Sequence, residues 1–301
     1  MKKTMVALLA LSGITMADDI TLLYGLDFNE KDNLGVIYKN VAENPGSGVV
    51  STVGDKHRNY VEGMDGSLAS DVRGSNYYFQ INSAENSQTG LGVNTSDGFT
   101  LTFNTKLPPK ITLDNGGVDD THWESFLAFN IGGQNMVFQY GDRKADANGY
   151  TTINVFTWNG ENATGGGGNI GANENDGKLS VAAITQDDTS SWYTVALTAK
   201  NGNLTLSVLD STASLIATTT VTSQYTGSLN SVSGYANYKF VSHSYIDNLA
   251  IYDDALTTEQ LATLTKYEVA NGTMLQTIPE PATATLSLLA LAGLAMRRRR
   301  K

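Results

Sequence analysis

Residues 244–264 read S-Y-I-D-N-L-A-I-Y-D-D-A-L-T-T-E-Q-L-A-T-L, a stretch that predicts a β-strand followed at once by a helix. Alternate side chains of a strand share one face, so Asp247 is expected on the face of Leu249 and Ile251. The pair Asp253-Asp254 interrupts the alternation. The strand is therefore expected to end there, and the chain to turn before the helix.

The helix is predicted to begin at Thr257. Thr257 precedes Gln260 by three residues, the spacing of a capping box, in which each side chain bonds to the other residue's backbone N–H group. Leu256 and Leu261 occupy the two positions of a hydrophobic staple around that cap. The sequence thus predicts one or two amphipathic helical turns packed against the domain.

The chain before this stretch predicts short strands separated by turns. Runs rich in Val, Ile, Thr, Tyr and Phe alternate with turn dipeptides such as Asn201-Gly202, and the 30 glycines suit many tight connections. Since no helical pattern intervenes, the sequence predicts an all-β, two-sheet antiparallel sandwich with one short C-terminal helix. The predicted strands are 21–28, 35–41, 77–82, 99–106, 125–131, 136–140, 151–158, 179–184, 192–199, 204–209 and 215–221.

Three stretches resemble a known family. Residues 246–264 resemble the end of a laminin-G-like domain of the concanavalin A superfamily. G-F-T-L-T-F at 98–103 resembles the central strand of that family, and S-W-Y-T-V-A-L-T at 191–198 resembles its Trp-led strand, followed by a Gly turn. The resemblance spans about residues 22–264. It implies a concanavalin A-like jelly-roll in which Trp192 is buried.

Composition limits the classes of function. The 301 residues are 41% hydrophobic, enough for one large β domain. No cysteine is present, which excludes disulfides, thiolate metal sites and a cysteine nucleophile. The formal charge is −10, and seven of the 20 basic residues lie in the two terminal segments. Nucleic-acid binding is not expected, because phosphate contacts need clustered Lys and Arg. The negative charge is ascribed to solubility outside the cell, with a specific cationic partner as the alternative.

The N-terminus is typical of a secretory signal peptide, which predicts export. Lys2-Lys3 form the basic start, residues 5–14 form the apolar core, and Thr15-Met16-Ala17 is a cleavage site with cleavage after Ala17. The apolar run is too short for a stable membrane span.

The C-terminus carries Pro279-Glu280-Pro281, then an apolar stretch at 282–296, then the basic end Arg297 to Lys301. These three parts resemble a PEP-CTERM sorting tail. The resemblance implies a transient inner-membrane anchor and processing by an exosortase-type transpeptidase; a plain C-terminal anchor helix is the alternative. The predicted organisation is a signal peptide (1–17), a laminin-G-like sandwich (18–270), a linker (271–278) and the sorting tail (279–301).

No catalytic constellation is present in the sequence. The laminarinase-type hydrolases of the superfamily use Glu-x-Asp-x-x-Glu on a strand, and that spacing of carboxylates does not occur. His57, His122 and His243 form no metal-binding spacing, and no G-x-S-x-G elbow occurs. The sequence therefore predicts a protein that is not an enzyme.

Two segments could serve binding. Residues 159–177 form a Gly-rich loop, which is either a mobile insertion or a lid over a binding face. Asp247 needs partners if it is buried. It either accepts backbone N–H bonds from a neighbouring loop or helps to bind Ca²⁺ together with Asp27. No D-x-D-x-D loop is present, so no cofactor is predicted and calcium stays unassigned.

The remaining candidates are aromatic. Trp158 and Trp123 are the candidate glycan-binding residues, because flat rings stack on sugars and both lie beside polar loops. The sequence thus predicts an exported, non-catalytic carbohydrate-binding or adhesion protein of the cell surface or extracellular matrix, with a polysaccharide as a candidate partner. A divergent glycoside hydrolase and a structural surface protein without a ligand are the alternatives.

Overall fold

The structure is a computed structural model. It describes residues 19–53, 58, 60–71, 78–84, 90–107, 111–112, 118–119, 124–140, 150–157, 170, 179–185, 188–234 and 245–279. The chain divides into two units, one of residues Thr21–Gln276 and one of the two ends, Met1–Ile20 and Thr277–Lys301. Residues 1–17, predicted as a signal peptide, and the part of the predicted sorting tail beyond Pro279 lie outside the described residues. The short strand β20 (Thr277–Ile278) belongs to the unit of the two ends.

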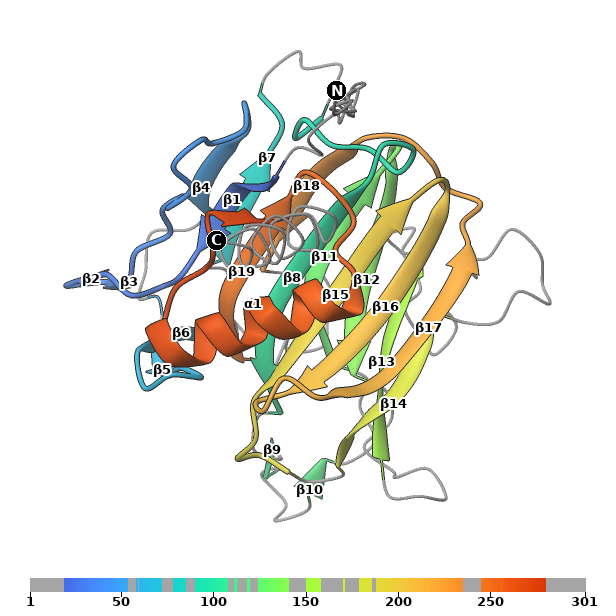
Figure 1. Cartoon of the computed structure of the whole chain (residues 1–301). Helices are drawn as coiled ribbons and strands as arrows, with labels where there is room; N and C mark the ends of the chain where they lie inside the picture. Colours follow the sequence, from blue (N-terminus) through green and yellow to red (C-terminus); the bar gives the residue numbers. More distant parts are fainter. Residues whose placement is uncertain are drawn as a thin grey trace, which may run out of the picture. The chain divides into compact units, whose positions relative to one another are not determined.

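The larger unit is a sandwich of two antiparallel sheets (Figure 1). In the first sheet, each strand is antiparallel to its neighbours and β6 pairs with one end of β19. Its strands follow the order β17 (Leu215–Thr222), β16 (Asn203–Asp210), β15 (Tyr193–Lys200), β8 (Phe99–Lys106), β19 (Tyr245–Tyr252) and β1 (Ile20–Leu26), with β6 (Leu68–Asp71) and β5 (Tyr60–Glu62) at the side.

The second sheet contains the strands β14 (Ser180–Thr185), β13 (Tyr150–Thr157), β12 (Gln134–Tyr140), β11 (Glu124–Ile131), β18 (Leu229–Ser233), β7 (Tyr78–Asn82) and β4 (Val49–Val53), in that order. Two small hairpins complete the described strands: β2 (Lys31–Asp32) with β3 (Gly35–Val36), and β9 (Ile111–Thr112) with β10 (Val118–Asp119). This arrangement confirms the predicted all-β antiparallel sandwich.

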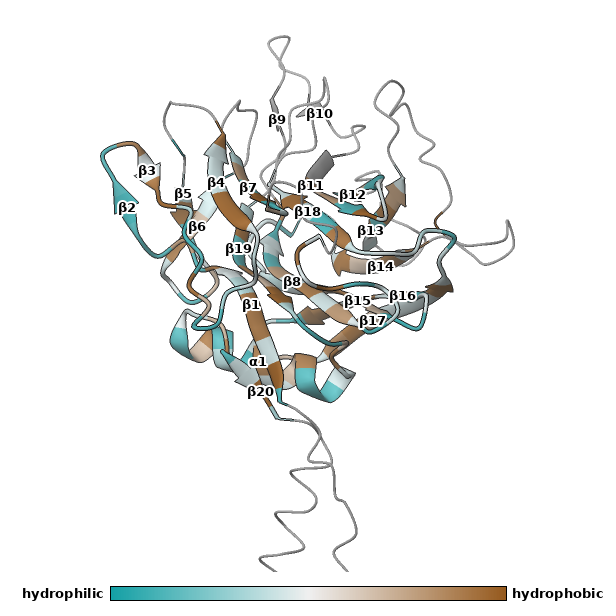
Figure 2. Cartoon of the chain, turned by 90° about the horizontal axis from the view of Figure 1, so that it is seen from above, coloured by the Kyte–Doolittle hydropathy of each residue, from teal (hydrophilic) through white to brown (hydrophobic). Residues whose placement is uncertain are grey.

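The core lies between the two sheets. Hydrophobic and hydrophilic residues alternate along many of the strands, as the colours of the ribbon show (Figure 2). Phe103 on β8 meets Phe138 on β12, with ring centroids 5.0 Å apart and nearly perpendicular planes. Phe129 on β11 lies 5.2 Å from Phe138. The first contact joins the two sheets edge-to-face, and the second is a tilted contact between neighbouring strands of the second sheet. Such ring pairs add to the free energy of area burial.

The helix α1 (Thr258–Asn271) has the predicted cap and is longer than predicted. Gln260 N donates to Thr257 Oγ1 at 3.2 Å, and Thr257 N donates to Gln260 Oε1 at 2.9 Å, which confirms the capping box. The helix has 14 residues instead of one or two turns and ends at Gly272, whose φ of 65° is left-handed. Its second half was missed because it buries Thr265 and Glu268, polar residues that break the apolar period.

The prediction for the faces of β19 is wrong. The strand register shifts between Asp247 and Ala250, and Asn248 has a φ of 45°, so a bulge reverses the alternation. Leu249 joins Ile246 and Ile251 in the core, whereas Asp247 bonds to the loop between β5 and β6. A bulge leaves no clear mark in the sequence, which explains the error.

The strand predictions are wrong for segments in which polar and apolar side chains follow no clear strand pattern. The predicted strand 35–41 is only the two-residue β3, and β4, β6 and β18 were not predicted. Strand β18 reads L-N-S-V-S, too polar and too short for a strand signal. In the part of the chain that the structure describes, no helix is long and apolar enough to cross a membrane.

Candidate recognition face

We call the outer face of the second sheet the amide face. Its residues alternate along each strand with core residues such as Ile153 and Val155, so they lie on the opposite side of the sheet. Most are amides, hydroxyls or small side chains. They are Val49, Ser51, Val53, Tyr78, Gln80, Asn82, Ala128, Asn130, Asn135, Val137, Gln139, Tyr150, Thr152, Asn154, Phe156, Ser180, Ala182, Ser231 and Ser233.

An apolar row crosses the middle of the amide face. Ala128 on β11 pairs with Val137 on β12, which pairs with Phe156 on β13. Val137 is only 2% exposed, whereas Phe156 is half-buried and keeps part of its ring accessible. In this row, the ring of Phe156 is therefore the accessible aromatic surface, and it lies beside the buried side chain of Val137.

Polar rows lie on both sides of the apolar row. Gln139 on β12 pairs with Asn154 on β13, and Asn154 pairs with Ser180 on β14. The Ser180 hydroxyl and Asn154 Oδ1 are hydrogen-bonded, and the Asn154 Nδ2 group has no partner among the described residues. Asn154 thus presents a donor beside the ring of Phe156.

Hydrogen bonds hold the second polar row in place. Asn130 Nδ2 donates to Asn135 Oδ1 at 2.7 Å, and Asn130 Oδ1 accepts from Asn230 Nδ2 at 2.9 Å and from Gly133 N at 3.0 Å. A register shift between β11 and β18 makes Asn230 a bulge residue, which brings its amide to Asn130. These side chains are ordered before any ligand binds, which lowers the entropic cost of binding.

A second polar cluster, the buried polar seam, lies between α1 and the first sheet. It comprises Asp247, Asn248, Asn104 and Glu268, each at most 1% exposed. Asn104 on β8 joins the layers: its Nδ2 donates to Glu268 Oε2 at 3.1 Å, and its Oδ1 accepts from Thr194 Oγ1 at 2.8 Å. Glu268 Oε1 and both amide atoms of Asn248 have no hydrogen-bond partner in the described structure.

The environment of Asp247 matches the simpler of the two sequence hypotheses. Asp247 Oδ2 accepts from Met64 N at 3.0 Å, in the loop between β5 and β6, and Oδ1 accepts from Asn248 N at 2.9 Å. Burial raises the pKa of Asp247 to about 8; the two backbone N–H groups lower it, and the charges of Asp65 and Asp27 raise it. Burial also raises the pKa of Glu268 well above its usual value, against the lowering effect of Asn104.

The buried polar seam is unsuited to catalysis on an external substrate, because Asp247 and Glu268 are 0% and 1% exposed. Within the described ranges, no group of three or more His, Cys, Asp or Glu side chains is spaced to hold a metal ion. Asp27 Oδ1 accepts from Asn29 N at 3.3 Å.

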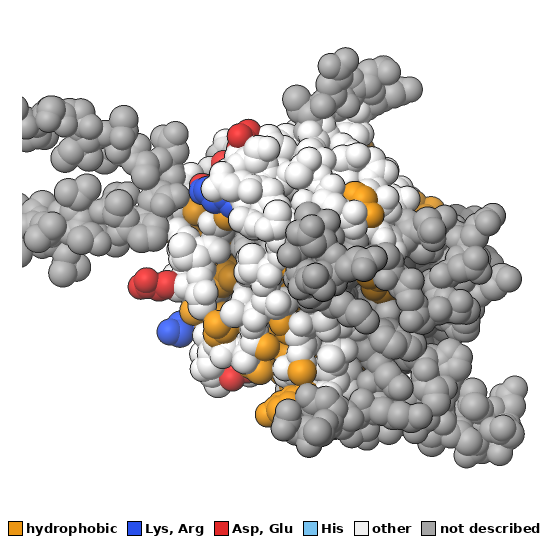
Figure 3. Space-filling view, turned by 90° about the vertical axis from the view of Figure 1, so that its right-hand side faces the viewer, with side chains coloured by type: hydrophobic (Ala, Val, Ile, Leu, Met, Phe, Trp, Pro, Cys, Tyr) orange, Lys and Arg blue, Asp and Glu red, His pale blue; other side chains and the backbone are white. Residues whose placement is uncertain are grey.

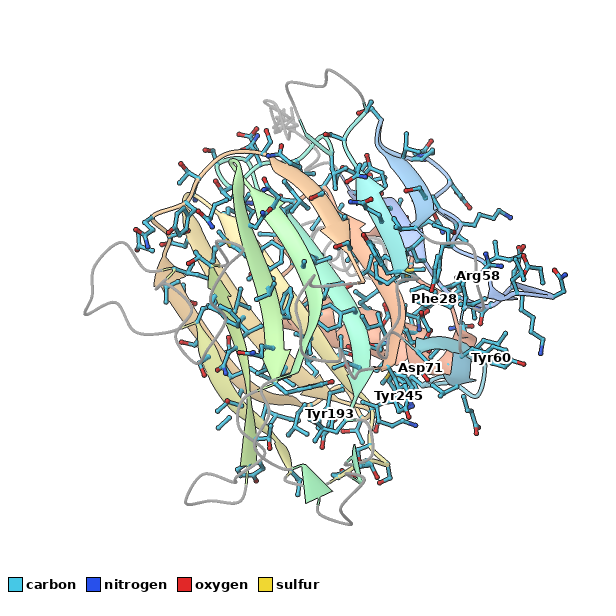
Figure 4. All side chains as sticks on the ribbon, turned by 180° about the vertical axis from the view of Figure 1, so that it is seen from behind. Phe28, Arg58, Tyr60, Asp71, Tyr193 and Tyr245 are labelled. Atoms are coloured by element: carbon cyan, nitrogen blue, oxygen red, sulfur yellow. The ribbon has the colours of Figure 1, made fainter. Side chains whose placement is uncertain are left out.

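A small aromatic cluster closes one end of the first sheet. Trp192 and Tyr245, each 7% exposed, pack with Ala69 on β6. Lys106 Nζ lies 5.0 Å from the centroid of the Trp192 ring and 5.5 Å from that of Tyr245. In Figure 4, Tyr245 lies close to Asp71, with which it pairs in the sheet. Trp192 is buried as expected, in this cluster and not in the main core.

The predicted glycan-binding residues Trp158 and Trp123, and the three histidines, lie outside the described residues. So do Ala17, Glu280 and Pro281; Pro279 is the last described residue. From the Gly-rich loop the structure describes only Ile170, which is buried in the core and accepts from Gln224 N at 3.0 Å through its carbonyl.

Phe156 was missed by the sequence reasoning, although a signal was present. Residues 151–157 read T-T-I-N-V-F-T, in which Ile153 and Val155 alternate with Thr152, Asn154 and Phe156. An aromatic residue on the polar face of a strand is unusual for a solvated surface. That alternation could have identified Phe156 as a candidate contact.

Solved structures of similar fold exist, although no protein-family model and no curated protein matches the chain. The binding domain of Paraclostridial Mosquitocidal Protein 1 matches with a TM-score of 0.51 and 13% identity, over 81% of this chain and 52% of that one. The botulinum neurotoxin serotype D binding domain matches with 0.50 and 11%, over 82% and 51%. The receptor binding domain of the botulinum neurotoxin C/D mosaic serotype matches with 0.50 and 12%, over 82% and 51%.

The chain thus spans about half the length of the solved structures that it matches. At 11–13% identity, the likeness concerns the fold alone. The class that the fold defines is the two-sheet antiparallel β-sandwich.

Proposed function

We propose that this protein is an exported, non-catalytic glycan-binding protein that binds its ligand on the amide face. The observation that carries the proposal is the half-buried ring of Phe156 beside the half-buried amide of Asn154, two residues earlier on the same face of β13. A sugar ring would stack its C–H face on Phe156 and bond its hydroxyls to the amide of Asn154. Stacking contributes about 1 kcal/mol, and each hydrogen bond a net ~0.5–1.5 kcal/mol.

A site with so few exposed contacts binds one sugar unit weakly. A few contacts of this size correspond to dissociation constants near the millimolar end of the range. Many copies on a cell surface or in a matrix would raise the overall affinity through multivalency. Weak single sites combined in many copies are typical of an adhesion or matrix protein.

Two further observations support a binding role over catalysis. The names of the three similar structures describe binding domains, one of them a receptor binding domain. Fold likeness alone does not establish function, so this support is by analogy. In addition, the two strongly perturbed carboxyls of the buried polar seam are shielded from any substrate.

Replacing Phe156 with alanine should weaken glycan binding by about fivefold, the loss of about 1 kcal/mol of stacking. Because Phe156 is only half-buried, the melting temperature should change little. The measurement is isothermal titration of the full-length chain with the glycans that an array identifies. Ile216→Ala, an exposed apolar residue (38%) on β17 of the other sheet, is the matched control and should bind normally.

Other outcomes would point to the alternative functions. Absence of any glycan bound by the wild-type chain would overturn the proposal and favour a structural surface protein. Cleavage of a bound glycan would instead identify a divergent glycoside hydrolase.

We also propose that residues 1–17 direct export and that residues 279–301 sort the protein. Ala282 to Met296 would span about 22 Å as a helix, shorter than the ~30 Å hydrocarbon core, so flanking residues or local thinning must complete a transient anchor. The basic end would keep the C-terminus in the cytoplasm. An exosortase-type transpeptidase would then act at Pro279-Glu280-Pro281 and release the sandwich to the cell surface or matrix.

Replacing Pro279, Glu280 and Pro281 with alanines should leave the tail attached and the protein in the membrane fraction. Proline favours an extended backbone at its own position and at the residue before it, which suits a processing enzyme, and alanine removes that restraint. Mass spectrometry and cell fractionation measure the result in the native host. Unchanged mature mass and unchanged surface delivery would show that the motif is not a sorting signal.

A further inference from the structure

The amide face carries no charge among the residues that the structure describes. Its side chains are amides, hydroxyls, Ala, Val, Phe156, and the phenol rings of Tyr78 and Tyr150. The whole chain has 30 acidic and 20 basic residues, so a neutral area that crosses the second sheet is distinctive. On the side of the molecule shown in Figure 3, acidic and basic side chains of the described residues are likewise few and scattered.

Cations elsewhere in the described structure are mostly engaged. Lys39 pairs with Glu30 at 3.3 Å, Arg58 with Asp32 at 2.5 Å, and Lys200 with Asp254 at 2.8 Å. Lys31 and Lys106 lie over aromatic rings. None of these five residues is on a strand of the second sheet.

The face is also long in the direction across the strands. The row Ala128–Val137–Phe156 and the row Gln139–Asn154–Ser180 run side by side from strand to strand. Val137 and Gln139 are buried, so the accessible surface of the rows comes from the other four residues. At a spacing of ~4.8 Å, the six strands from β7 to β14 span about 24 Å. A single sugar ring would cover only a small part of either row.

We infer that the ligand of the amide face is a neutral, extended polysaccharide lying across the strands. This inference rests on the proposed glycan-binding function and specifies its ligand class. A polymer with carboxylate or sulfate groups is recognised through Arg or Lys, and a polymer of amino sugars through Asp or Glu. Amides and hydroxyls both donate and accept, which matches neutral sugar hydroxyls.

The test compares three polymers by affinity electrophoresis of the full-length chain: galactomannan and hydroxyethyl cellulose as neutral probes, and polygalacturonate as the anionic probe. At least one neutral probe should retard the protein equally at about 50 mM and about 500 mM NaCl, because salt does not screen contacts between uncharged groups. Oligosaccharides of the bound polymer should bind more tightly as their length increases.

Two charge variants at one position sharpen the test. Asn154→Lys and Asn154→Asp should each weaken binding of the neutral polymer by about fivefold or more, since each places a charge beside the ring of Phe156 and removes the Nδ2 donor. Neither variant should gain binding to polygalacturonate. Asn203→Lys, an exposed position on β16 of the first sheet, is the control and should bind like the wild type.

The failures can be told apart. Salt-sensitive binding of polygalacturonate, strengthened by Asn154→Lys and without binding of the neutral probes, would overturn the neutral ligand and keep glycan binding. If none of the three polymers and no array glycan binds, the proposed function itself fails. Melting curves of both variants show whether each remains folded, and Asn154→Ser gives a small uncharged replacement if they do not.

Discussion

The free energy of unfolding should fall as the pH rises from about 5 to about 8, because folding keeps protons on two buried acids. Burial raises the pKa of Asp247 to about 8 and that of Glu268 well above its usual value. In the unfolded chain, both carboxyls lose their protons near their ordinary pKa values, about 4. The folded state therefore binds more protons in this window, and stability is lost with rising pH.

The expected effect is large. One unit of pKa difference corresponds to about 1.4 kcal/mol, so Asp247 alone would cost on the order of 4 kcal/mol between about pH 5 and about pH 8. The groups around the two acids do not neutralise them. Asp65 and Asp27 add negative charge near Asp247, Asp247 itself acts on Glu268, and only uncharged donors oppose them.

Carboxyls with lowered pKa act in a different pH range. Hydrogen bonds from Ser190 and Ser191 to Asp188, from Thr212 to Asp210, and from Arg58 to Asp32 hold the pKa values of these three acids below the ordinary value. Their contributions to stability are present above about pH 4 and are lost below it. Stability should therefore be greatest in mildly acidic solution.

Glu268→Gln is the variant that tests the source of the slope. Glutamine can still accept from Asn104 Nδ2 and carries no ionisable proton, so the decline of stability between about pH 5 and about pH 8 should become shallower. Glu259→Gln, at an exposed position in the first turn of α1, should keep the wild-type slope. Urea unfolding at several pH values measures both. A wild-type stability that is flat or rises over this range would contradict the role given to the buried polar seam.

Much of the fold could be predicted from local patterns. Strand β8 (Phe99–Lys106) matches its prediction, and β17 (Leu215–Thr222) differs from its prediction by one residue, because both are uninterrupted runs with strong β propensity. The capping box at Thr257 was visible because it depends on only two residues, three apart. Features of this kind depend only on residues that are close together in the sequence, so the sequence alone predicts them.

Features that depend on partners far along the chain could not be predicted. The bulge at Asn248 exists because β19 must pair with β8, about 140 residues earlier, and the length of α1 depends on the polar contact between Glu268 and Asn104. For the same reason the sequence could not show that Phe156 lies beside Val137 and Asn154 lies opposite Gln139. The amide face arises only from the register of its strands.

Replacing Trp192 with alanine should destabilise the fold by ~3–5 kcal/mol, the usual cost of removing a buried large aromatic side chain. The ring is 7% exposed and packs with Tyr245 and Ala69 at the end of the first sheet, where β6 joins β19. Its loss would leave a cavity beneath Lys106, and the strands on either side are fixed by backbone pairing and could not close it.

Lys106→Ala separates the contribution of the ring from that of the cation above it. A cation–π contact at a partly exposed site contributes about 0.5–1 kcal/mol, so this variant should lose at most that amount. Denaturant unfolding of both variants at one pH gives the comparison, and glycan binding by Trp192→Ala should persist below its melting temperature because the amide face is on the other sheet. Trp192→Ala could instead lose no more stability than Lys106→Ala. That result would show that the Trp192 ring contributes little to stability and that the small aromatic cluster does not stabilise this end of the sandwich.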